Sequence, residues 1–440
     1  MWDPEAGQCY YFNTNTESVQ WDPPTKGAQF GAAFRKRRFK FLHLLAHAMP
    51  PVMVCHRSDG GGGAGGDDDG GEGHGERGGG GNASTTTTSL RVVELTIRRE
   101  RLVQDSFLRV RQLGPEDLRS KTRVSYVGEP GIDSGGLTKD WFLELPRHLL
   151  DPSYCLFRGN VQGDFYVDKR SGVNEDHLDY FEFLGLLLGK AMHDRQLVDT
   201  PFAPMVYKYL LGHNVTISDM ESIDKVHCRS LRWMLDNPIA GVVDETFSIA
   251  VEEFGETKQV ELVPGGVEVA VTETNKAQYV KNVVAYHTTG SVGAQLKHFK
   301  RGFNRLVPAE TLAGVSHADL HLLLNGLDEV ETETIRTNAR YLGGYDADAP
   351  PVRFFWEAFE AMSAVQRRSL LKFTTGSSRM PFEGLEPAFT ITKSQHGEAA
   401  LPSSHTCFNN LVLPPYSNLP QMVRKLLTAT MVHGEGFHMT

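Results

Sequence analysis

The stretch LPSSHTCFNNLVLPPY, residues 401–416, holds one cysteine, Cys407, directly behind His405 and Thr406. Free cysteine is among the most buried residue types, so a structural role is the first interpretation. A nucleophile would need a thiolate fraction, access and a place for an acyl group. The prolines before Tyr416 cannot continue a regular helix, which predicts a loop. In an extended loop, His405 would share a side with Cys407 and help to hold a thiolate or relay a proton. The Thr406 hydroxyl could bond the loop or a bound carbonyl.

The composition of the whole chain excludes several classes of protein. The 440 residues allow two to four domains, and 40% of them are hydrophobic, which is enough for a sizeable core. No apolar run approaches the roughly 18 residues of a membrane span, and the first residues are not a signal peptide. The net charge of −9 argues against a nucleic-acid-binding surface across the protein.

The cysteines indicate a reducing compartment. The five of them are odd in number and far apart, without CxxC spacing: Cys9, Cys55, Cys155, Cys228 and Cys407. This pattern argues against a disulfide framework and against a zinc site. We therefore expect a soluble, cytoplasmic protein.

A glycine-rich tract divides the chain into a short head and a long body. Residues 60–81 contain 14 glycines in 22 positions, and the serine- and threonine-rich run at 84–89 prolongs them. Such a segment cannot bury enough apolar surface to offset its ordering entropy. We expect a disordered, tether-like insertion over residues 58–89.

The head begins with DPEAGQCYYFNTNTESVQWDPP, residues 3–24, which predicts two short strands around an Asn-Thr-Asn turn. It resembles the second and third strands of a WW domain, with Tyr10 and Trp21 where such domains grip proline-rich peptides. Trp2 is too close to Trp21 to be the earlier tryptophan of that family. A two-stranded hairpin is marginal in water, so residues 1–26 are predicted to be a truncated WW-like module.

The second feature of the head is FRKRRFKFLHLLAHA, residues 34–48, within a predicted segment 30–50. Phe34, Phe41 and Leu45 fall on one face of a helix, beside a basic face. A basic run can signal nuclear import or an acidic membrane surface. The favoured interpretation is an amphipathic helix that packs on the body with its charges solvated.

The body mixes helices and strands. Residues 174–194 predict a buried helix with Asn174 as its N-cap, because apolar side chains recur at helical spacing and fill its middle. Residues 266–287 predict strand alternation that passes through a polar turn into a helix. The polar stretch GLDEVETE, residues 326–333, follows a leucine-rich helix and is a candidate hinge.

The segment around Cys407 resembles the active-site segment of HECT-type ubiquitin ligases, and the resemblance runs in order from about residue 90 to the end. The matching segments are RRERLVQDSFLRV (98–110), GEPGIDSGGLTKDWFLEL (128–145), NEDHLDYFEFLGLLLGKAMHDRQLVD (174–199), SLRWMLDNP (230–238), EFGETKQVELVPGG (253–266), FKRGFNRLVP (299–308) and LLKFTTGSSRMPFEG (370–384). The helix at 34–48 is similar to the one that opens this domain in the WW-domain-bearing subgroup. The glycine-rich insertion departs from the family.

The resemblance implies an α+β fold with two lobes. A large, mainly helical N-terminal lobe over residues 90–327 would contain a small subdomain that binds a ubiquitin-conjugating enzyme. An α/β C-terminal lobe over residues 328–440 would carry Cys407. The partial WW-like hairpin would precede them.

The resemblance also implies the chemistry. Cys407 would accept ubiquitin from the conjugating enzyme as a thioester and pass it to a lysine of a protein substrate, without any cofactor or metal. His405 and Thr406 would assist. A carboxylate would deprotonate the acceptor lysine, and Glu435 and the terminal carboxylate of Thr440 are candidates for this role.

Three further sites follow from the resemblance alone. The conjugating enzyme would dock around Leu231, Tyr279 and Val283, although each of these residues could equally belong to the core. A second, non-covalent ubiquitin surface would include Tyr154 and Phe254. Phe437 would anchor the C-terminal lobe or would fray with the tail.

Two other functions compete with a ligase. One is an inactive, ligase-like scaffold that binds proline-rich partners through the WW-like module. The other is a cysteine protease, but only His433 and His438 follow Cys407, and no papain-like signature surrounds it. The intact His405-Thr406-Cys407 triplet favours the ligase, whose partners would be the conjugating enzyme, ubiquitin and protein substrates.

Overall fold

The computed structural model describes residues 30–57, 86–129, 136–160, 163–253, 255–327, 332–381 and 384–435, with short strands at 2–3, 8–9, 11–13 and 18–20. The glycine-rich tract, the polar residues 328–331 and the last five residues of the chain lie outside the described residues.

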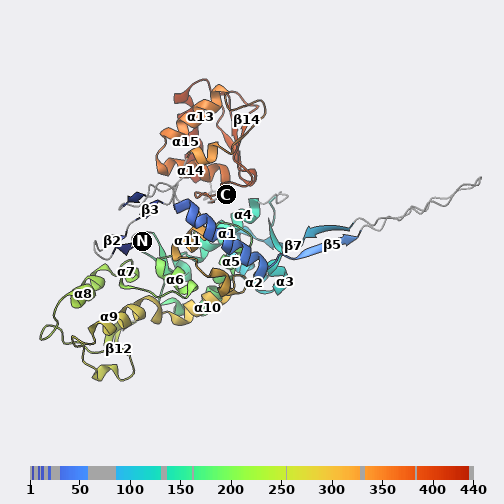
Figure 1. The fold of residues 1–440 in the computed structure, drawn as a ribbon. Helices are drawn as coiled ribbons and strands as arrows, with labels where there is room; N and C mark the ends of the chain where they lie inside the picture. The colour runs from blue at the N-terminus through green and yellow to red at the C-terminus, as the bar shows by residue number, and fades with distance from the viewer. Residues whose placement is uncertain are drawn as a thin grey trace, which may run out of the picture.

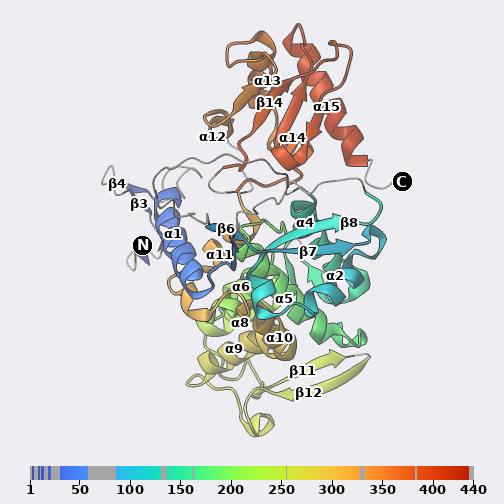
Figure 2. The same ribbon diagram turned by 90° about the vertical axis from the view of Figure 1, so that its right-hand side faces the viewer.

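Three hydrophobic cores divide the described chain. The largest gathers residues between Phe41 and Leu324, the smallest residues between Met220 and Val284, and the third residues between Ile335 and Ala429. Figures 1 and 2 place the third core in a separate lobe at one end of the molecule and the smallest core at the opposite end. The mixture of helices and strands in these bodies confirms the expected α+β fold.

The large lobe is built around α5 (His177–His193), whose middle is buried on all sides. Its neighbour α10 (Gly293–Asn304) crosses it closely. The predicted N-cap at Asn174 is wrong, because the helix begins three residues later. The Asn174 side chain instead accepts a hydrogen bond from the Asp176 N–H at 3.1 Å and donates one to the Tyr154 carbonyl at 3.1 Å.

One face of the large lobe carries a parallel strand pair, β7 (Val92–Ile97) and β8 (Lys121–Tyr126), with α2 (Leu102–Arg111) and α4 (Gly136–Leu149) beside it. Two hydrogen bonds fix α4. The Thr138 hydroxyl accepts from the Val124 N–H at 2.9 Å, and the Trp141 indole donates to the Ser106 hydroxyl at 2.8 Å. This helix also contacts the C-terminal lobe.

The predicted amphipathic helix is α1 (Phe30–Ala48), and it packs against α11 (His317–Asn325). Phe34, Phe41 and Leu45 are buried, as the spacing predicted. The basic face is not fully solvated, because Arg37 forms a two-pronged ion pair at 2.7 and 2.8 Å with the buried carboxylate of Asp319. Two antiparallel strands follow α1: β5 (Met53–Arg57) and β6 (Thr86–Leu90).

The small subdomain surrounds the smallest core. Its elements are α7 (Ile217–Met220), α8 (Lys225–Asp236), β11 (Ser248–Glu253), β12 (Glu256–Glu261), η4 (Gly266–Glu268) and α9 (Lys276–Ala285). The strand predicted after residue 266 is reduced to an isolated bridge between Thr246 and Ala270. A π-helical turn, η5 (Tyr286–Gly290), returns the chain to the large lobe.

The C-terminal lobe contains a four-stranded sheet in the order β13 (Arg340–Leu342), β14 (Thr390–Lys393), β16 (Asn410–Leu413), β15 (Ser403–His405). The first three strands are parallel, and β15 is antiparallel to β16. The longer helices of this lobe are α13 (Pro350–Ala361), α14 (Ala364–Thr375) and α15 (Leu419–Glu435). A capping box at Ser363 begins α14, and left-handed Gly376 ends it.

The remaining elements are short. They are η1 (Arg99–Arg101), α3 (Pro115–Arg119), η2 (Pro152–Tyr154), β9 (Phe157–Gly159), β10 (Phe165–Val167), η3 (Ser171–Val173), α6 (Pro204–Leu211), η6 (Ala309–Leu312) and α12 (Thr332–Arg336). At the N-terminus, β1 (Trp2–Asp3) pairs with β2 (Gln8–Cys9), and the predicted hairpin is present as β3 (Tyr11–Asn13) and β4 (Ser18–Gln20). Across the described chain, no helix combines the length and apolar character required to cross a bilayer.

Candidate active site

Cys407 lies in a tight turn rather than in the extended loop that we predicted. Strand β15 ends at His405, residues Thr406–Phe408 form the 3₁₀ turn η7, and Asn409 takes a left-handed conformation with φ 49°. The argument that His405 and Cys407 share one side of an extended strand therefore fails. His405, which precedes the turn, is exposed, and Phe408, its last residue, is 53% exposed. The Cys407 side chain lies outside what the structure describes.

Asn409 stabilises this turn, residues Thr406–Phe408, which we call the cysteine turn. Its amide nitrogen donates to the Pro387 carbonyl at 2.6 Å, and its backbone N–H donates to the Thr406 carbonyl at 3.3 Å. Its own carbonyl accepts from the Thr390 N–H at 3.0 Å. Asn409 is buried, and asparagine tolerates the left-handed conformation. We missed it in the sequence, where the Asn-Asn pair after the cysteine is the available signal.

The segment that follows the turn is anchored at Tyr416. The Tyr416 hydroxyl donates to the Ala400 carbonyl at 2.8 Å, which ties together the two ends of the stretch 401–416. The phenol is buried, and its burial raises the pKa of Tyr416 above the ordinary value, so the hydroxyl stays a donor. The stretch that contains the cysteine turn is thus anchored at both ends within the C-terminal lobe.

Helix α4 of the N-terminal lobe contacts the cysteine turn. The Lys139 ammonium donates to the Thr375 carbonyl at the end of α14 and to the Asn409 Oδ1 at 3.3 Å. A second contact lies nearby in the sequence of the C-terminal lobe, where Asp199 accepts from the Ser378 hydroxyl at 3.1 Å and pairs with the Arg379 guanidinium at 2.6 Å. These residues lie far apart in sequence, and our sequence prediction did not include them.

Two described carboxylates near the start of α4, Glu129 and Asp140, are paired. Arg99 binds Glu129 at 2.5 Å and Asp140 at 2.9 Å. Burial raises the pKa of Asp140, while the Arg99 guanidinium opposes this shift. Of the two predicted bases for the acceptor lysine, Glu435 is the last residue of α15 and its side chain is not described, and Thr440 lies outside the described residues.

The predicted docking residues of the conjugating enzyme belong to the core. Leu231, Tyr279 and Val283 are 2%, 5% and 0% exposed, so their assignment as exposed anchors is wrong and the core alternative holds. Apolar residues at helical spacing serve a core and a surface equally well in sequence, which explains the error. The exposed apolar side chains of α8 are Val226, Trp233 and Leu235.

The other predicted site residues are only partly described. Tyr154 is partly buried, accepts a hydrogen bond from the Gln104 side-chain amide at 3.2 Å and packs edge-on against Tyr180. Phe254, Phe437, Tyr10 and Trp21 lie outside the described residues. No group of three metal-ligating side chains occurs within the described ranges.

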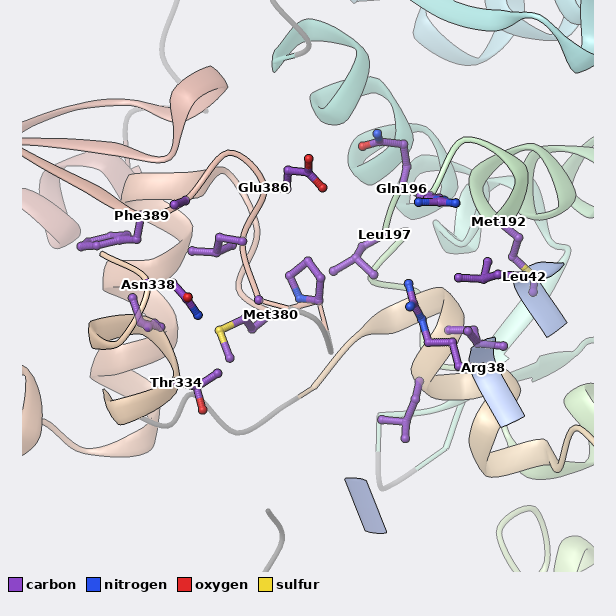
Figure 3. Close-up of a pocket in the computed structure, with 18 of the residues that line it drawn as sticks. Arg38, Leu42, Met192, Gln196, Leu197, Thr334, Asn338, Met380, Glu386 and Phe389 are labelled. Carbon is purple, nitrogen blue, oxygen red and sulfur yellow. The ribbon is translucent and has the colours of Figure 1, made fainter. Parts of the chain in front are cut away.

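The junction of the lobes also encloses open space. A cavity of 490 Å³ lies at this junction. Figure 3 shows residues that line it: Arg38, Leu42, Met192 and Leu197 on the N-terminal side and Thr334, Asn338, Met380 and Phe389 on the C-terminal side. Burial and the nearby Arg195 guanidinium lower the pKa of Arg38. The lobes therefore meet through polar contacts and a cavity rather than through one continuous apolar core.

The fold and the site define a two-lobed α+β protein with a cysteine turn at the lobe junction. The family model described as HECT-domain (ubiquitin-transferase) matches residues 143–440, and the chain belongs to this family. A WW-domain model matches residues 1–24.

Curated relatives of this chain are named as E3 ubiquitin-protein ligases. The chain is 36% identical over 355 residues to the E3 ubiquitin-protein ligase TOM1 of Saccharomyces cerevisiae, which is 78% of this chain and 11% of that protein. It is 35% identical over 347 residues to the E3 ubiquitin-protein ligase RSP5 of Chaetomium thermophilum, which is 76% of this chain and 42% of that protein. The chain thus spans between about a tenth and two fifths of the length of these relatives.

Proposed function

We propose that this chain is a HECT-type ubiquitin ligase that carries ubiquitin on Cys407 as a thioester and transfers it to substrate lysines. The observation that carries the proposal is the cysteine turn of a HECT-family chain, held by buried Asn409 where the two lobes meet, with His405 and Phe408 exposed beside Cys407. A cysteine nucleophile needs a firmly held backbone and neighbours that leave room for an acyl group.

The reaction consists of two acyl transfers. The Cys407 thiolate attacks the thioester carbonyl of ubiquitin on the conjugating enzyme, the C–S bond to that enzyme breaks, and its thiolate leaves. A neutral lysine amine then attacks the new thioester, loses a proton to a base and expels the Cys407 thiolate as the isopeptide bond forms. Thioester exchange is nearly isoenergetic, so positioning contributes more than a strong base. Exposed His405 would stabilise the thiolate, and Thr406 would bond the carbonyl.

The partners of the proposed ligase follow from its surfaces. The small subdomain would receive the conjugating enzyme on α8, where exposed Val226 and Trp233 lie two turns apart on one face. The surface at Tyr154 and Phe254 would hold a second ubiquitin, Phe437 would anchor the C-terminal lobe, and the WW-matching segment would bring proline-rich substrates. A cytoplasmic location belongs to the same proposal, because a free thiolate requires a reducing compartment.

The test is incubation with activating enzyme, conjugating enzyme and ubiquitin, followed by gels with and without reductant. The wild-type chain should form an adduct that reductant removes, whereas an inactive scaffold or a protease would form none. Cys407→Ser should give an oxyester that resists reductant, or no adduct, and should abolish ligation.

The matched control is Cys228→Ser. Cys228 is buried in the small subdomain, and its thiol donates to the Ile217 carbonyl at 3.4 Å, a bond that a serine hydroxyl can keep. This variant should retain the reductant-sensitive adduct. Continued ligation by Cys407→Ser would show that another residue carries ubiquitin.

A further inference from the structure

The N-terminal lobe holds the C-terminal lobe at two polar points, which we call the interlobe clamp. The first consists of Lys139 with the Thr375 carbonyl and the Asn409 side chain. The second consists of Asp199 with Ser378 and Arg379. The first contact reaches the end of α14 and the cysteine turn, and the second reaches the segment between α14 and β14.

The first point joins α4 directly to the cysteine turn. Thr375 is the last residue of α14, and a cation beside a helix C-terminus is favoured by the carbonyls that are exposed there. Asn409, the other acceptor, follows Cys407 by two residues and sets the shape of η7 through its bonds to Pro387 and Thr406. The Lys139 ammonium, which carries three donor hydrogens, therefore fixes the orientation of the cysteine turn against the N-terminal lobe.

The second contact of the interlobe clamp is fixed within the N-terminal lobe. Asp199 has a left-handed backbone with φ 46°, and the Arg147 guanidinium of α4 also binds its carboxylate. The Asp199 and Arg379 side chains are 12% and 13% exposed, so salt screens this ion pair only weakly. Two parts of the N-terminal lobe, α4 and the segment at Asp199, thus contact the same short stretch of the C-terminal lobe, from Thr375 to Arg379.

The contacts of the interlobe clamp form in the relative orientation of the two lobes that this structure shows. In Figures 1 and 2, the C-terminal lobe and the small subdomain lie at opposite ends of the molecule, with the large lobe between them. A conjugating enzyme on α8 would hold its thioester at the end away from α4. Loading of Cys407 would need a different lobe orientation, in which the contact between Lys139 and Asn409 is absent.

We propose that Lys139 is a positioning residue for the second transfer, from Cys407 to lysine, and takes no part in the first. This inference rests on the proposed ligase function. Lys139 docks the loaded cysteine turn on α4 and thereby fixes the thioester for attack by the acceptor amine.

Two single-turnover rates test the inference: loading from the conjugating enzyme, and discharge of preloaded protein onto free lysine. Hydrogen bonds from charged donors contribute enough for roughly a ten- to hundredfold effect on a rate. Lys139→Ala should therefore load within about twofold of the wild-type rate and discharge roughly ten- to hundredfold more slowly. Lys139→Arg keeps the positive charge and its donors and should restore most of the discharge rate. Lys297→Ala, at an exposed position of α10, should match the wild type in both steps.

A second measurement does not depend on ubiquitin. Dyes attached through non-canonical residues at exposed positions 242 and 365 report the distance between the small subdomain and the C-terminal lobe. Lys139→Ala should broaden the distance distribution, and Lys139→Arg should restore it. Unchanged discharge and an unchanged distribution in Lys139→Ala would overturn the inference, as would equal losses in both transfer steps. Absence of a wild-type thioester would refute the ligase function, and the dye distances would still decide whether Lys139 clamps the lobes.

Discussion

At the scale of single residues, His287 is a half-buried titratable group in the turn that joins the small subdomain to the large lobe. It lies in η5, and its ring is 5.1 Å from that of His227 on α8, at nearly a right angle. Burial first, and then the proximity of His227, lower the pKa of His287 to about 4, against the opposing effect of Asp224. The folded protein therefore keeps His287 neutral at neutral pH.

We predict that acid weakens this junction through His287. The pKa of a histidine in the unfolded chain is near 6.5, whereas that of His287 in the folded protein is about 4. Between these two values the unfolded state binds a proton at this residue and the folded state does not, so lowering the pH favours unfolding. Stability is therefore lost as the pH falls, by about 2 kcal/mol between pH 7 and pH 5 for this group. Urea unfolding at both pH values should show a correspondingly smaller loss in His287→Gln than in the wild type.

The control for this prediction is His43→Gln, at an exposed position on α1. It should retain the wild-type dependence on pH, because the substitution leaves His287 and its surroundings unchanged. Equal pH dependence in His287→Gln and the wild type would contradict the assignment.

Single residues also show what a sequence can and cannot indicate. Cys407 was singled out through the family resemblance of a continuous segment, whose residues are its neighbours in the chain. Lys139 and Asp199 were not, because they approach the cysteine turn only through the packing of α4 and the large lobe. Leu231 was misassigned because burial depends on which helix covers it.

At the scale of elements, the crossing of α5 and α10 is set by glycines. A Cβ on Gly185 would lie 1.9 Å from the Phe299 carbonyl oxygen, and one on Gly302 would lie 1.9 Å from that of Glu182. Each helix thus presents a glycine to the backbone of the other. Because the obstructing atoms are backbone atoms, no side-chain rotation can relieve the clash.

We predict that Gly302→Ala forces the two helices apart and lowers the free energy of unfolding by about 1–3 kcal/mol, the usual cost of overpacking. The control lies in the same helix, since a Cβ on Gly293, the first residue of α10, would meet no atom within 4 Å. Gly293→Ala should be neutral or stabilising by up to about 1 kcal/mol, because alanine favours helix. Urea unfolding of both variants checks the pair, and equal stabilities would contradict a backbone clash at Gly302.

The elements were predicted best where the apolar pattern is long. Helix α5 was found from its spacing, but Asn174 was misread as its cap because its side chain serves a preceding turn instead. The strand expected after residue 266 shrinks to one bridge at Ala270, since no second strand continues the pairing. Local alternation predicts a strand only when a partner is present to satisfy its backbone.

At the scale of the whole molecule, two separate cores lie on either side of the polar stretch 326–333. Leu327 already pairs with Met380 of the C-terminal lobe, its N–H donating to that carbonyl at 2.8 Å, and Thr332 begins α12. The polar composition of this stretch predicted a hinge, and the two lobes were implied by the family resemblance. It did not predict the orientation of the lobes, which depends on contacts between distant residues such as those of the interlobe clamp.

The last prediction concerns that stretch as a hinge. If loading and discharge need different lobe orientations, the chain between the lobes must absorb changes in its backbone angles. Proline fixes its own φ and restricts the residue before it. Replacing Asp328, Glu329, Val330 and Glu331 with prolines should therefore slow both single-turnover steps, whereas Lys139→Ala should slow discharge alone. Glycines at the same four positions should leave both steps near the wild-type rates, and circular dichroism should show that both variants are folded. Wild-type rates in the proline variant would mean that the lobes turn about another point.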